Sequence, residues 1–280
     1  MKYTSKAAAA FVLVAAMAAT VTTGATVVRA QPGPALRVCA DPNYMPYSNR
    51  AGEGFENKVA QELGRTLHRP VSYTWASMRG PGGFDQFLHD TLNANRCDVV
   101  IDVPYASTNV LASRPYYVSS YVFVFQKKRN YDITSMDSPA LKSLKIGFES
   151  ETPAEMGLKV RALVLHAVPF DIGDTPGESP ETMLDAVTSG KVAVAVTWEP
   201  SVGYYLRSRS DLHVVAVPNS RTMGSPEQYA FPMAMAARTG DNRTRAQLDS
   251  AIGKDQAGFT RILQQYGVQL YQPTDVGFAR

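Results

Sequence analysis

The sequence predicts an α/β fold of two lobes, each built on a mostly parallel sheet, with two crossing strands as hinges. Three observations support this fold class. Short apolar runs alternate with segments of helical periodicity from residue 36 onward. A second series of this kind starts near residue 144, and a further strand and a long helix follow it. Because the second series interrupts the first, we expect lobe I at residues 31–123 and 228–280 and lobe II, inserted, at residues 124–227.

Lobe I is expected to begin with a β-α-β-α-β unit. The run 36–40 is short and apolar, as in a buried strand, and apolar side chains then recur every four residues from Phe55 to Leu67, as on one face of a helix. The next expected elements are a strand at 71–75, a glycine-rich loop at 80–83, a helix carrying Phe84, Phe87, Leu88, Thr91 and Leu92 on one face, and a strand at 97–101. Strands that alternate with helices favour parallel pairing.

Lobe II and the return to lobe I show the same alternation. The β-prone run 121–126 leads out of lobe I. Ser179 supplies an N-cap and Pro180 a first helical position for a helix that Gly190 ends. The other expected elements are strands at 144–148, 192–197 and 213–217, helices at 154–166 and 200–208, a returning strand at 230–237, and a helix with Leu248, Ile252, Phe259, Ile262, Leu263 and Tyr266 on one face. The hinges are expected near 121–125 and 228–231.

The first thirty residues have the pattern of a secretory signal peptide. Lys2 and Lys6 give a positive start, residues 7–19 form an apolar core, and small residues precede a cleavage site after Ala30. A membrane anchor needs roughly 18 or more uninterrupted apolar residues, and three threonines and an arginine interrupt this run. We therefore expect export to the periplasm.

The charge of the exported chain excludes several classes of partner. Three of the 28 basic side chains leave with the signal peptide and none of the 25 acidic ones does, so 25 of each remain and the net charge is zero. Proteins that bind nucleic acids or anionic lipids carry a basic surplus. No other apolar run is long enough to span a membrane. We expect neither nucleic-acid binding nor membrane insertion.

Two cysteines, Cys39 and Cys97, remain after cleavage, with 57 residues between them. An even pair in an oxidising compartment favours a disulfide, which would tie two neighbouring strands of one sheet. A metal site is disfavoured because there is no CxxC motif and the four histidines are scattered.

Several short motifs match one superfamily in order and spacing. They read DPNYMPY at 41–47, GFE at 54–56, CDVV at 97–100, SRPYY at 113–117 and LKIG at 144–147. With them the chain resembles the type II periplasmic solute-binding proteins of the polar amino-acid-receptor superfamily over nearly the whole exported length. The resemblance implies two lobes that close on a ligand cleft.

A narrower resemblance rests on RVCADPN at 37–43, GEGFEN at 52–57 and TLNANRCD at 91–98. These segments are similar to those of the binding-protein-like partners of periplasmic pyrroloquinoline-quinone (PQQ) methanol dehydrogenases, the MoxJ/XoxJ type. The resemblance implies a periplasmic accessory in the maturation or activation of such a dehydrogenase, with the lanthanide type slightly favoured. It implies no quinone bound by this chain, and we expect no cofactor.

The fixed charges that hold a zwitterion in the superfamily are missing here. The carboxylate-binding arginine is expected near Ala106, and the nearest arginine is Arg114. Trp198 stands where a second-lobe acid holds the amino group, although Glu199 is beside it and a one-residue shift in the alignment would restore the acid. The usual Gly-Thr pair is replaced by Glu-Ser-Glu-Thr at 149–152, whose carboxylates would repel an anion. We therefore expect no amino-acid ligand.

The remaining candidate cleft is aromatic and suits an apolar or weakly charged small molecule, or a segment of a partner protein. Its rings could instead be core or hinge packing, above all Tyr116 and Tyr117. The candidate cleft residues are Asp41, Asn43, Tyr44, Tyr47, Glu56, Trp75, Tyr105, Arg114, Tyr116, Glu149, Thr152, Trp198 and Glu199.

Enzymatic function is not expected. Glu53 with Glu56, and Asp98 with Asp102, are pairs of acids close in sequence, but Glu53 and Glu56 are most simply acids favoured by a helix N-terminus. No general base, Ser/His/Asp arrangement or phosphate-binding loop is recognisable. A site for a hard cation, built from Asp41 and Asn43 with these glutamates, lacks the spacing of a known loop. Three hypotheses follow: an accessory protein of a quinoprotein dehydrogenase, a solute receptor of a transporter, and a dehydratase or transglycosylase.

Overall fold

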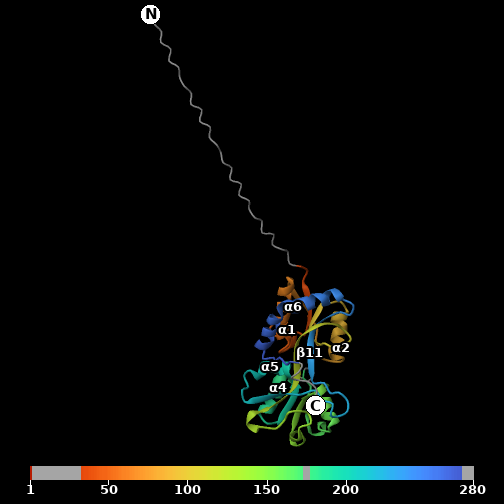
Figure 1. The fold of residues 1–280 in the computed structure, drawn as a ribbon, viewed down its shortest axis with the longest axis vertical. Coiled ribbons are helices and arrows are strands. Elements are labelled where there is room, and N and C mark those ends of the chain that lie inside the picture. Colours follow the sequence, from red (N-terminus) through yellow and green to blue (C-terminus); the bar gives the residue numbers. More distant parts are fainter. Residues whose placement is uncertain (2–32, 173–176, 273–280) are drawn as a thin grey trace. The chain divides into compact units, whose positions relative to one another are not determined.

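Nine strands form one continuous sheet in the part of the chain that the structure describes (Figure 1). The structure is a computed structural model that describes Met1 and residues 33–172 and 177–272. The expected signal peptide, apart from Met1, lies outside the described residues. The strands are β1 (Leu36–Ala40), β2 (Asn43–Tyr44), β3 (Ser48–Asn49), β4 (Val71–Trp75), β5 (Val99–Pro104), β6 (Leu111–Gln126), β7 (Ile146–Glu149), β8 (Val168–Phe170), β9 (Val194–Trp198), β10 (Leu212–Ala216) and β11 (Ala230–Ala237). The sheet runs in the order β4-β1-β5-β11-β6-β9-β7-β8, with β10 also on β6, and β2 pairs separately with β3.

Six α-helices accompany the strands in the described ranges: α1 (Phe55–Leu67), α2 (Gly83–Leu88), α3 (Pro153–Val160), α4 (Pro180–Thr188), α5 (Glu199–Leu206) and α6 (Asn242–Gln265). The Ser179 side chain accepts a hydrogen bond from the backbone N–H of Thr182, so the expected N-cap of α4 is confirmed. The expected helix at 154–166 ends earlier, because a 3₁₀ turn at Val164–His166 replaces its last part.

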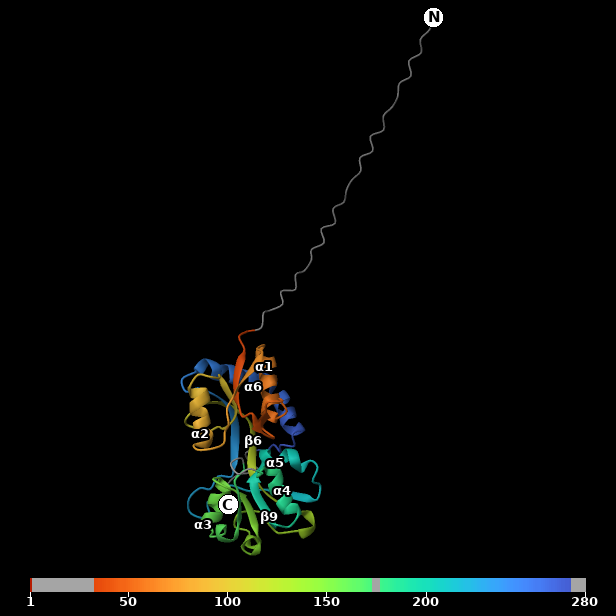
Figure 2. The ribbon, with the colours of Figure 1, turned by 180° about the vertical axis from the view of Figure 1, so that it is seen from behind.

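Lobe I packs helices on both faces of its sheet. β1 pairs in parallel with β4 and with β5. Val38 and Ile101 pack in one core cluster with α1 and α6, while Val100 packs in another with Leu88 and Leu92 beside α2. Figures 1 and 2 show α1 and α6 together on one face of the sheet and α2 on the other. The alternation along each strand therefore buries both faces.

Lobe II repeats this arrangement with a smaller sheet. β7 pairs in parallel with β8 and with β9. Ala154 and Leu158 of α3 pack on one face of this sheet, with Phe123 and Phe148. α4 and α5 pack on the other face, in the cluster that contains Val122.

Two long strands cross between the lobes. β6 pairs antiparallel with β11 from Leu111 to Ser120, and with β9 and β10 from Tyr121 to Gln126. The sequence predicted a strand only at 121–126. Its first half was missed because Pro115 and several serines interrupt the apolar pattern, and the register with β11 shifts beside that proline. The domain boundaries near residues 123 and 227 stay a prediction.

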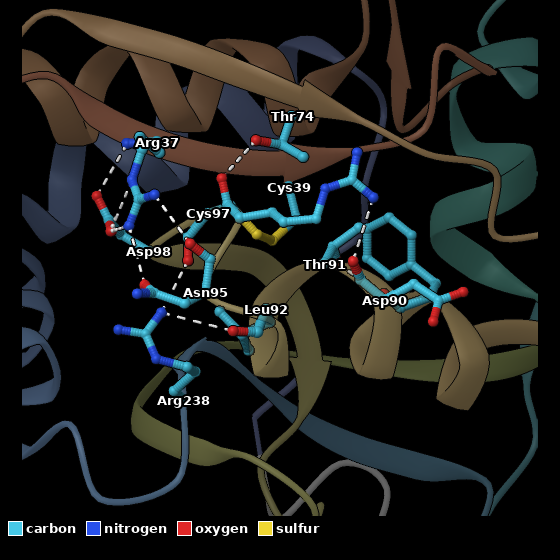
Figure 3. Close-up of a disulfide and its surroundings, with 12 residues drawn as sticks. Arg37, Cys39, Thr74, Asp90, Thr91, Leu92, Asn95, Cys97, Asp98 and Arg238 are labelled. Atoms are coloured by element: carbon cyan, nitrogen blue, oxygen red, sulfur yellow. Dashed lines mark hydrogen bonds and ion pairs between the residues drawn. A yellow bond between two sulfur atoms is a disulfide. The ribbon is translucent and has the colours of Figure 1, made fainter.

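The disulfide joins the ends of two neighbouring strands, as expected. Cys39 of β1 and Cys97, just before β5, are bonded with 5.5 Å between their Cα atoms. The Arg238 guanidinium donates to the Cys97 carbonyl at 2.9 Å, and Arg37 pairs with the Asp98 carboxylate at 2.6 Å (Figure 3). The bridge therefore lies within a set of contacts that holds the start of β5 against β1.

Candidate functional site

A cleft lies between the two lobes and contains a cavity of about 460 Å³. A second volume of about 260 Å³ adjoins it. Both are lined by the same six residues, Tyr44, Tyr47, Phe84, Pro104, Trp198 and Met233. Tyr121, Glu149, Pro153, Ser201 and Phe231 complete the first, and Glu56, Met78, Arg79, Asp102 and Ile172 complete the second. We call the two volumes together the cleft.

The carboxyl ends of parallel strands place much of this lining. Tyr44 follows β1, Pro104 ends β5, Glu149 ends β7 and Trp198 ends β9. In open α/β sheets ligands bind at this edge, because the loops that leave the strands there can converge on one space.

Stacked tyrosines form one wall of the cleft and contact the other lobe. The Tyr44 and Tyr47 rings stack with centroids 4.8 Å apart. The Tyr47 hydroxyl and the Ser201 hydroxyl of α5 share a hydrogen bond of 2.7 Å. Arg79 lies over the Tyr44 ring at 5.3 Å and donates to the Asn43 carbonyl at 2.8 Å. One hydrogen bond thus connects the tyrosine wall of lobe I to lobe II across the cleft.

The Asp102 carboxyl is held by tyrosines from β6. The Tyr117 hydroxyl donates to it at 2.9 Å and the Tyr116 hydroxyl at 3.3 Å. Burial raises the pKa of Asp102 to about 7, although these two hydrogen bonds act in the opposite direction. Tyr116 itself is buried against Phe259, so it supports the cleft from the core of lobe I rather than lining it.

The Glu56 carboxyl has no comparable support. It lies in the first turn of α1, and its side chain is only 5% exposed. None of the described residues donates a hydrogen bond to this carboxyl. Burial raises its pKa well above the ordinary value, and the nearby Asp102 and Asp41 carboxylates raise it further. The side chain borders the smaller cavity.

Close backbone packing fixes the position of Glu56. The backbone N–H of Glu56 donates to the Tyr47 carbonyl at 2.9 Å. A Cβ atom at Gly54, just before α1, would lie 2.0 Å from the same carbonyl oxygen. Only glycine permits the backbone to come this close to the Tyr47 carbonyl. This close contact fixes the first turn of α1 against the tyrosine wall.

A third carboxyl, Glu149, enters the cleft from lobe II. It accepts a hydrogen bond from the Thr197 hydroxyl at 3.4 Å, and burial raises its pKa to about 7. Thr152, a predicted cleft residue, lies outside the lining at the N-cap position of α3, where its hydroxyl donates to the Glu149 carbonyl at 2.6 Å instead of capping the helix. The described lining therefore contains three carboxyls, of which Glu56 is buried and Asp102 and Glu149 are half-buried, and Arg79 is its single basic side chain.

Asp41 and Asn43 support the cleft loops instead of facing the cavity. The two oxygens of the buried Asp41 carboxylate accept hydrogen bonds from the backbone N–H groups of Asn43, at 2.8 Å, and Met78, at 2.7 Å. Asn43 is itself exposed and holds Arg79 through its carbonyl. These contacts connect the loop after β1 to the loop after β4.

Glu199 lies at the junction of the lobes, outside the cavity lining. Its side chain is 1% exposed and accepts hydrogen bonds from the Gln269 backbone N–H at 3.0 Å and the Ser119 hydroxyl at 3.3 Å. Burial raises its pKa to about 8. The neighbouring Trp198 ring does enter the cleft and packs against Tyr121 and Phe231.

Three of the predicted cleft residues lie elsewhere in the described structure. Trp75 ends β4, where its ring stacks on Tyr73 and the Arg50 guanidinium lies over it. Tyr105 is 50% exposed and follows β5 outside the lining. The exposed Arg114 lies beside α6, where its backbone N–H donates to Asp249 at 2.6 Å.

Sequence reasoning left several cleft residues out of the candidate set. Asp102 had a usable signal, because an acid at the carboxyl end of a parallel strand points toward the usual ligand edge. Arg79, Phe84 and Ser201 had none, since loop conformation and lobe packing place them. No group of three or more His, Cys, Asp or Glu side chains within the described residues is placed to hold a metal ion. In the same residues, no helix is long and apolar enough to cross a bilayer.

Known proteins with similar sequences identify the family. Protein MoxJ of Methylorubrum extorquens is 31% identical over 250 residues, an alignment that covers 83% of this chain and 80% of that protein. This chain belongs to the MoxJ family. Protein MoxJ of Paracoccus denitrificans is 25% identical over 254 residues, 84% of this chain and 88% of that protein. No protein-family model matches the chain.

Solved structures with the MoxJ-family fold support the same assignment. MxaJ from Methlophaga aminisulfidivorans matches with a TM-score of 0.74 and 27% identity, covering 84% of this chain and all of that one. The periplasmic binding protein XoxJ from Methylobacterium extorquens matches with a TM-score of 0.66 and 28% identity, covering 85% and 99%. The MoxJ-family chain described here therefore has the two-lobed type II periplasmic binding protein fold.

Proposed function

We propose that this protein is a periplasmic accessory factor that assists the maturation or activation of a PQQ-dependent methanol dehydrogenase, with the lanthanide-type enzyme as the first partner to test. Membership of the MoxJ family is the observation that carries the proposal. In this proposal the protein is exported by its signal peptide, cleaved after Ala30, and is not itself an enzyme.

The lining of the cleft supports binding of a partner segment rather than a free amino acid. Arg114, the nearest candidate for a carboxylate clamp, lies beside α6 and outside the lining. Glu149 stands in the segment where the superfamily presents backbone N–H groups to an anion, and its charge opposes one. Stacked tyrosines and Trp198 instead offer the rigid aromatic surface that anchors protein segments at interfaces.

A matched pair of tyrosine variants tests this use of the cleft. Tagged protein of residues 31–280 is incubated with native periplasmic extract, and the captured proteins are identified by mass spectrometry. Tyr44→Ala removes a ring that lines the cleft, whereas Tyr105→Ala removes an exposed ring outside it. We expect a quinoprotein dehydrogenase with wild type and Tyr105→Ala, and at least about a tenfold loss with Tyr44→Ala. Capture of transporter components alone, or of no partner, would contradict the proposal.

The second candidate function is a solute receptor of a transport system. The cavity of about 460 Å³ has the size of a small-metabolite site. The Tyr47–Ser201 hydrogen bond connects the two lobes on either side of it. Native mass spectrometry of the periplasmically expressed protein tests this function. A bound metabolite that survives purification and is displaced in Tyr44→Ala would favour the receptor over the accessory factor.

A further inference from the structure

We infer that the cleft binds an organic cation, an ammonium or guanidinium group carried on an apolar stem. The inference rests on the proposed function only in taking the cleft as the binding site, and it adds the chemistry of the ligand. It stands on an unpartnered buried carboxyl, on two further carboxyls in the same lining, and on the aromatic rings between them.

The Glu56 carboxyl is the first part of the argument. Its side chain is 5% exposed and borders the cavity, yet no described residue donates a hydrogen bond to it. The enclosed side-chain atoms without a partner in the described residues are Asn57 Nδ2 and Gln126 Oε1, so the Glu56 oxygens stay open to the cavity. A carboxyl in this position takes its hydrogen bonds from whatever fills the cavity, because the protein around it supplies none. An ammonium or guanidinium group in the cavity would supply the missing donors.

The second part is the excess of acidic groups in the lining. Asp102 lies near enough to Glu56 to raise its pKa, and Glu149 faces the same space from lobe II. Against these three carboxyls, the lining has only Arg79, whose guanidinium is already engaged by the Asn43 carbonyl and the Tyr44 ring. Closely spaced acids that are shielded from water resist ionisation together, and a cation between them removes this repulsion.

The rings determine the rest of the ligand. Tyr44, Tyr47, Phe84 and Trp198 surround the cavity, and such faces attract both an apolar stem and a cation. A free amino acid carries a carboxylate next to its ammonium group. The acids of the lining would repel that carboxylate, and no basic clamp would bind it. The ligand is therefore an amine or guanidine without a neighbouring carboxylate. A lysine or arginine side chain of a partner segment and a free organic amine share this chemistry.

Calorimetry with matched probes tests the inference. The first pair is phenethylammonium and 2-phenylethanol, which have nearly the same shape and differ in charge. The second pair is a short end-blocked peptide with one lysine and the same peptide with norleucine. We expect binding of the charged member of at least one pair, at least tenfold tighter than its neutral counterpart. Preference for the amine points to a free metabolite, and preference for the peptide to a partner segment.

Two glutamates three positions apart, Glu56 and Glu53, provide the matched variants. Glu56→Gln should weaken binding of the charged probe by roughly 10- to 100-fold, since a charged hydrogen bond is lost. Glu53→Gln changes an exposed glutamate in the adjacent loop and should leave binding unchanged. Equal binding of charged and neutral probes, no binding of either charged probe, or equal effects of the two variants would overturn the inference.

Proton release gives an independent readout. Glu56, Asp102 and Glu149 all have raised pKa values, so a cation that favours their charged forms must release protons on binding. Tyr44 also faces Glu56, and burial holds the pKa of its phenol far above this pH range, so it stays neutral. The Asp41 carboxylate faces Glu56 as well, and its charge raises the pKa of Glu56 in the same direction as burial does. We expect the affinity for the charged probe to rise by about tenfold or more from pH 5.5 to 7.5. An affinity that is flat or falls with pH contradicts the assignment.

The test separates the inference from the proposed function. If the protein captures a quinoprotein dehydrogenase through Tyr44 but binds neither charged probe, the accessory function stands and the cation inference fails. If a charged probe binds through Glu56 and no dehydrogenase is captured, the cation inference stands and the proposed function fails.

Discussion

Two buried glutamates, Glu56 and Glu199, differ in what surrounds them. Both lie in the first turn of a helix, both are at most 5% exposed, and burial raises the pKa of both. Glu199 accepts hydrogen bonds from Ser119 of β6 and from the backbone of Gln269, two segments far apart in the sequence. Glu56 accepts none from the described residues and borders a cavity.

The difference separates structural from ligand-binding acids more sharply than burial or pKa does. A buried carboxyl with protein donors stabilises the contact among the segments that supply them. A buried carboxyl without donors costs folding free energy, and a ligand that supplies the donors recovers it. Stability measurements should therefore respond strongly to changes at Glu199 and weakly to changes at Glu56, and binding measurements should do the reverse.

The largest effect on stability is expected from Glu199→Ala. The change leaves the Gln269 N–H and the Ser119 hydroxyl without an acceptor and opens a cavity beside α5. We expect the free energy of unfolding to fall by roughly 2–4 kcal/mol, measured by urea denaturation. The matched control is Glu199→Gln, which keeps an acceptor for Gln269 and should lose less than half as much. Equal losses in the two variants would mean that these hydrogen bonds do not account for the role of Glu199.

The pH dependence of stability is the next largest effect. The pKa of Glu199 is about 8 in the folded chain against 4.5 for an ordinary glutamate, and the folded chain therefore keeps a proton that the unfolded chain has lost between these values. The contribution of Glu199 is complete below pH 4.5 and is lost as the pH rises toward 8. Asp102 and Glu149 act in the same direction up to about pH 7, and Glu56, whose pKa is also raised, acts in that direction too. We expect the free energy of unfolding to fall by at least about 1 kcal/mol from pH 5 to pH 8.

Glu199→Gln sharpens this pH measurement. The variant removes one of four carboxyls with raised pKa values, the others being Glu56, Asp102 and Glu149, so its unfolding free energy should depend less steeply on pH than that of the wild type. A slope of the opposite sign in the wild type, or an unchanged slope in the variant, would show that Glu199 is ionised in the folded chain at neutral pH.

The sequence predicted the scaffold of this comparison well. The four-residue spacing of apolar side chains from Phe55 marks α1, and the short apolar run before Asp41 marks β1, because each pattern depends only on local periodicity. The pairing of Cys39 with Cys97 followed from the number of cysteines and the expected compartment. The two-lobed topology followed from the order of the elements and the resemblance.

The placement of individual side chains was harder to predict. β6 begins at Leu111 although the part that pairs with β11 contains Pro115 and the buried Ser113, Ser119 and Ser120, because this pairing outweighs local propensity. The same limit applies to the cleft. Whether a glutamate at a helix start finds a donor depends on segments up to 80 residues away, as the contacts of Glu199 with Ser119 and Gln269 illustrate. No local pattern encodes these contacts.

Removing the hydrogen bond that connects the lobes should have a moderate effect. Tyr47→Phe deletes the hydroxyl that contacts Ser201 and keeps the ring stacked on Tyr44. We expect a loss of about 1 kcal/mol in the free energy of unfolding. Ser201→Ala removes the other partner, and the double variant should lose no more than the larger single change. Additive losses in this double-mutant cycle would show that the contact does not form in solution.

The smallest effect on stability is expected from Glu56→Gln, and this result tests the comparison most directly. The change deletes no hydrogen bond within the described residues and removes the repulsion between Glu56 and Asp102. The unliganded variant should therefore be as stable as the wild type within about 0.5 kcal/mol at pH 7, or slightly more stable. A loss of 2 kcal/mol or more, similar to that expected for Glu199→Ala, would mean that Glu56 is structural. The combination of unchanged stability with lost cation binding is the outcome that a purely structural glutamate cannot give.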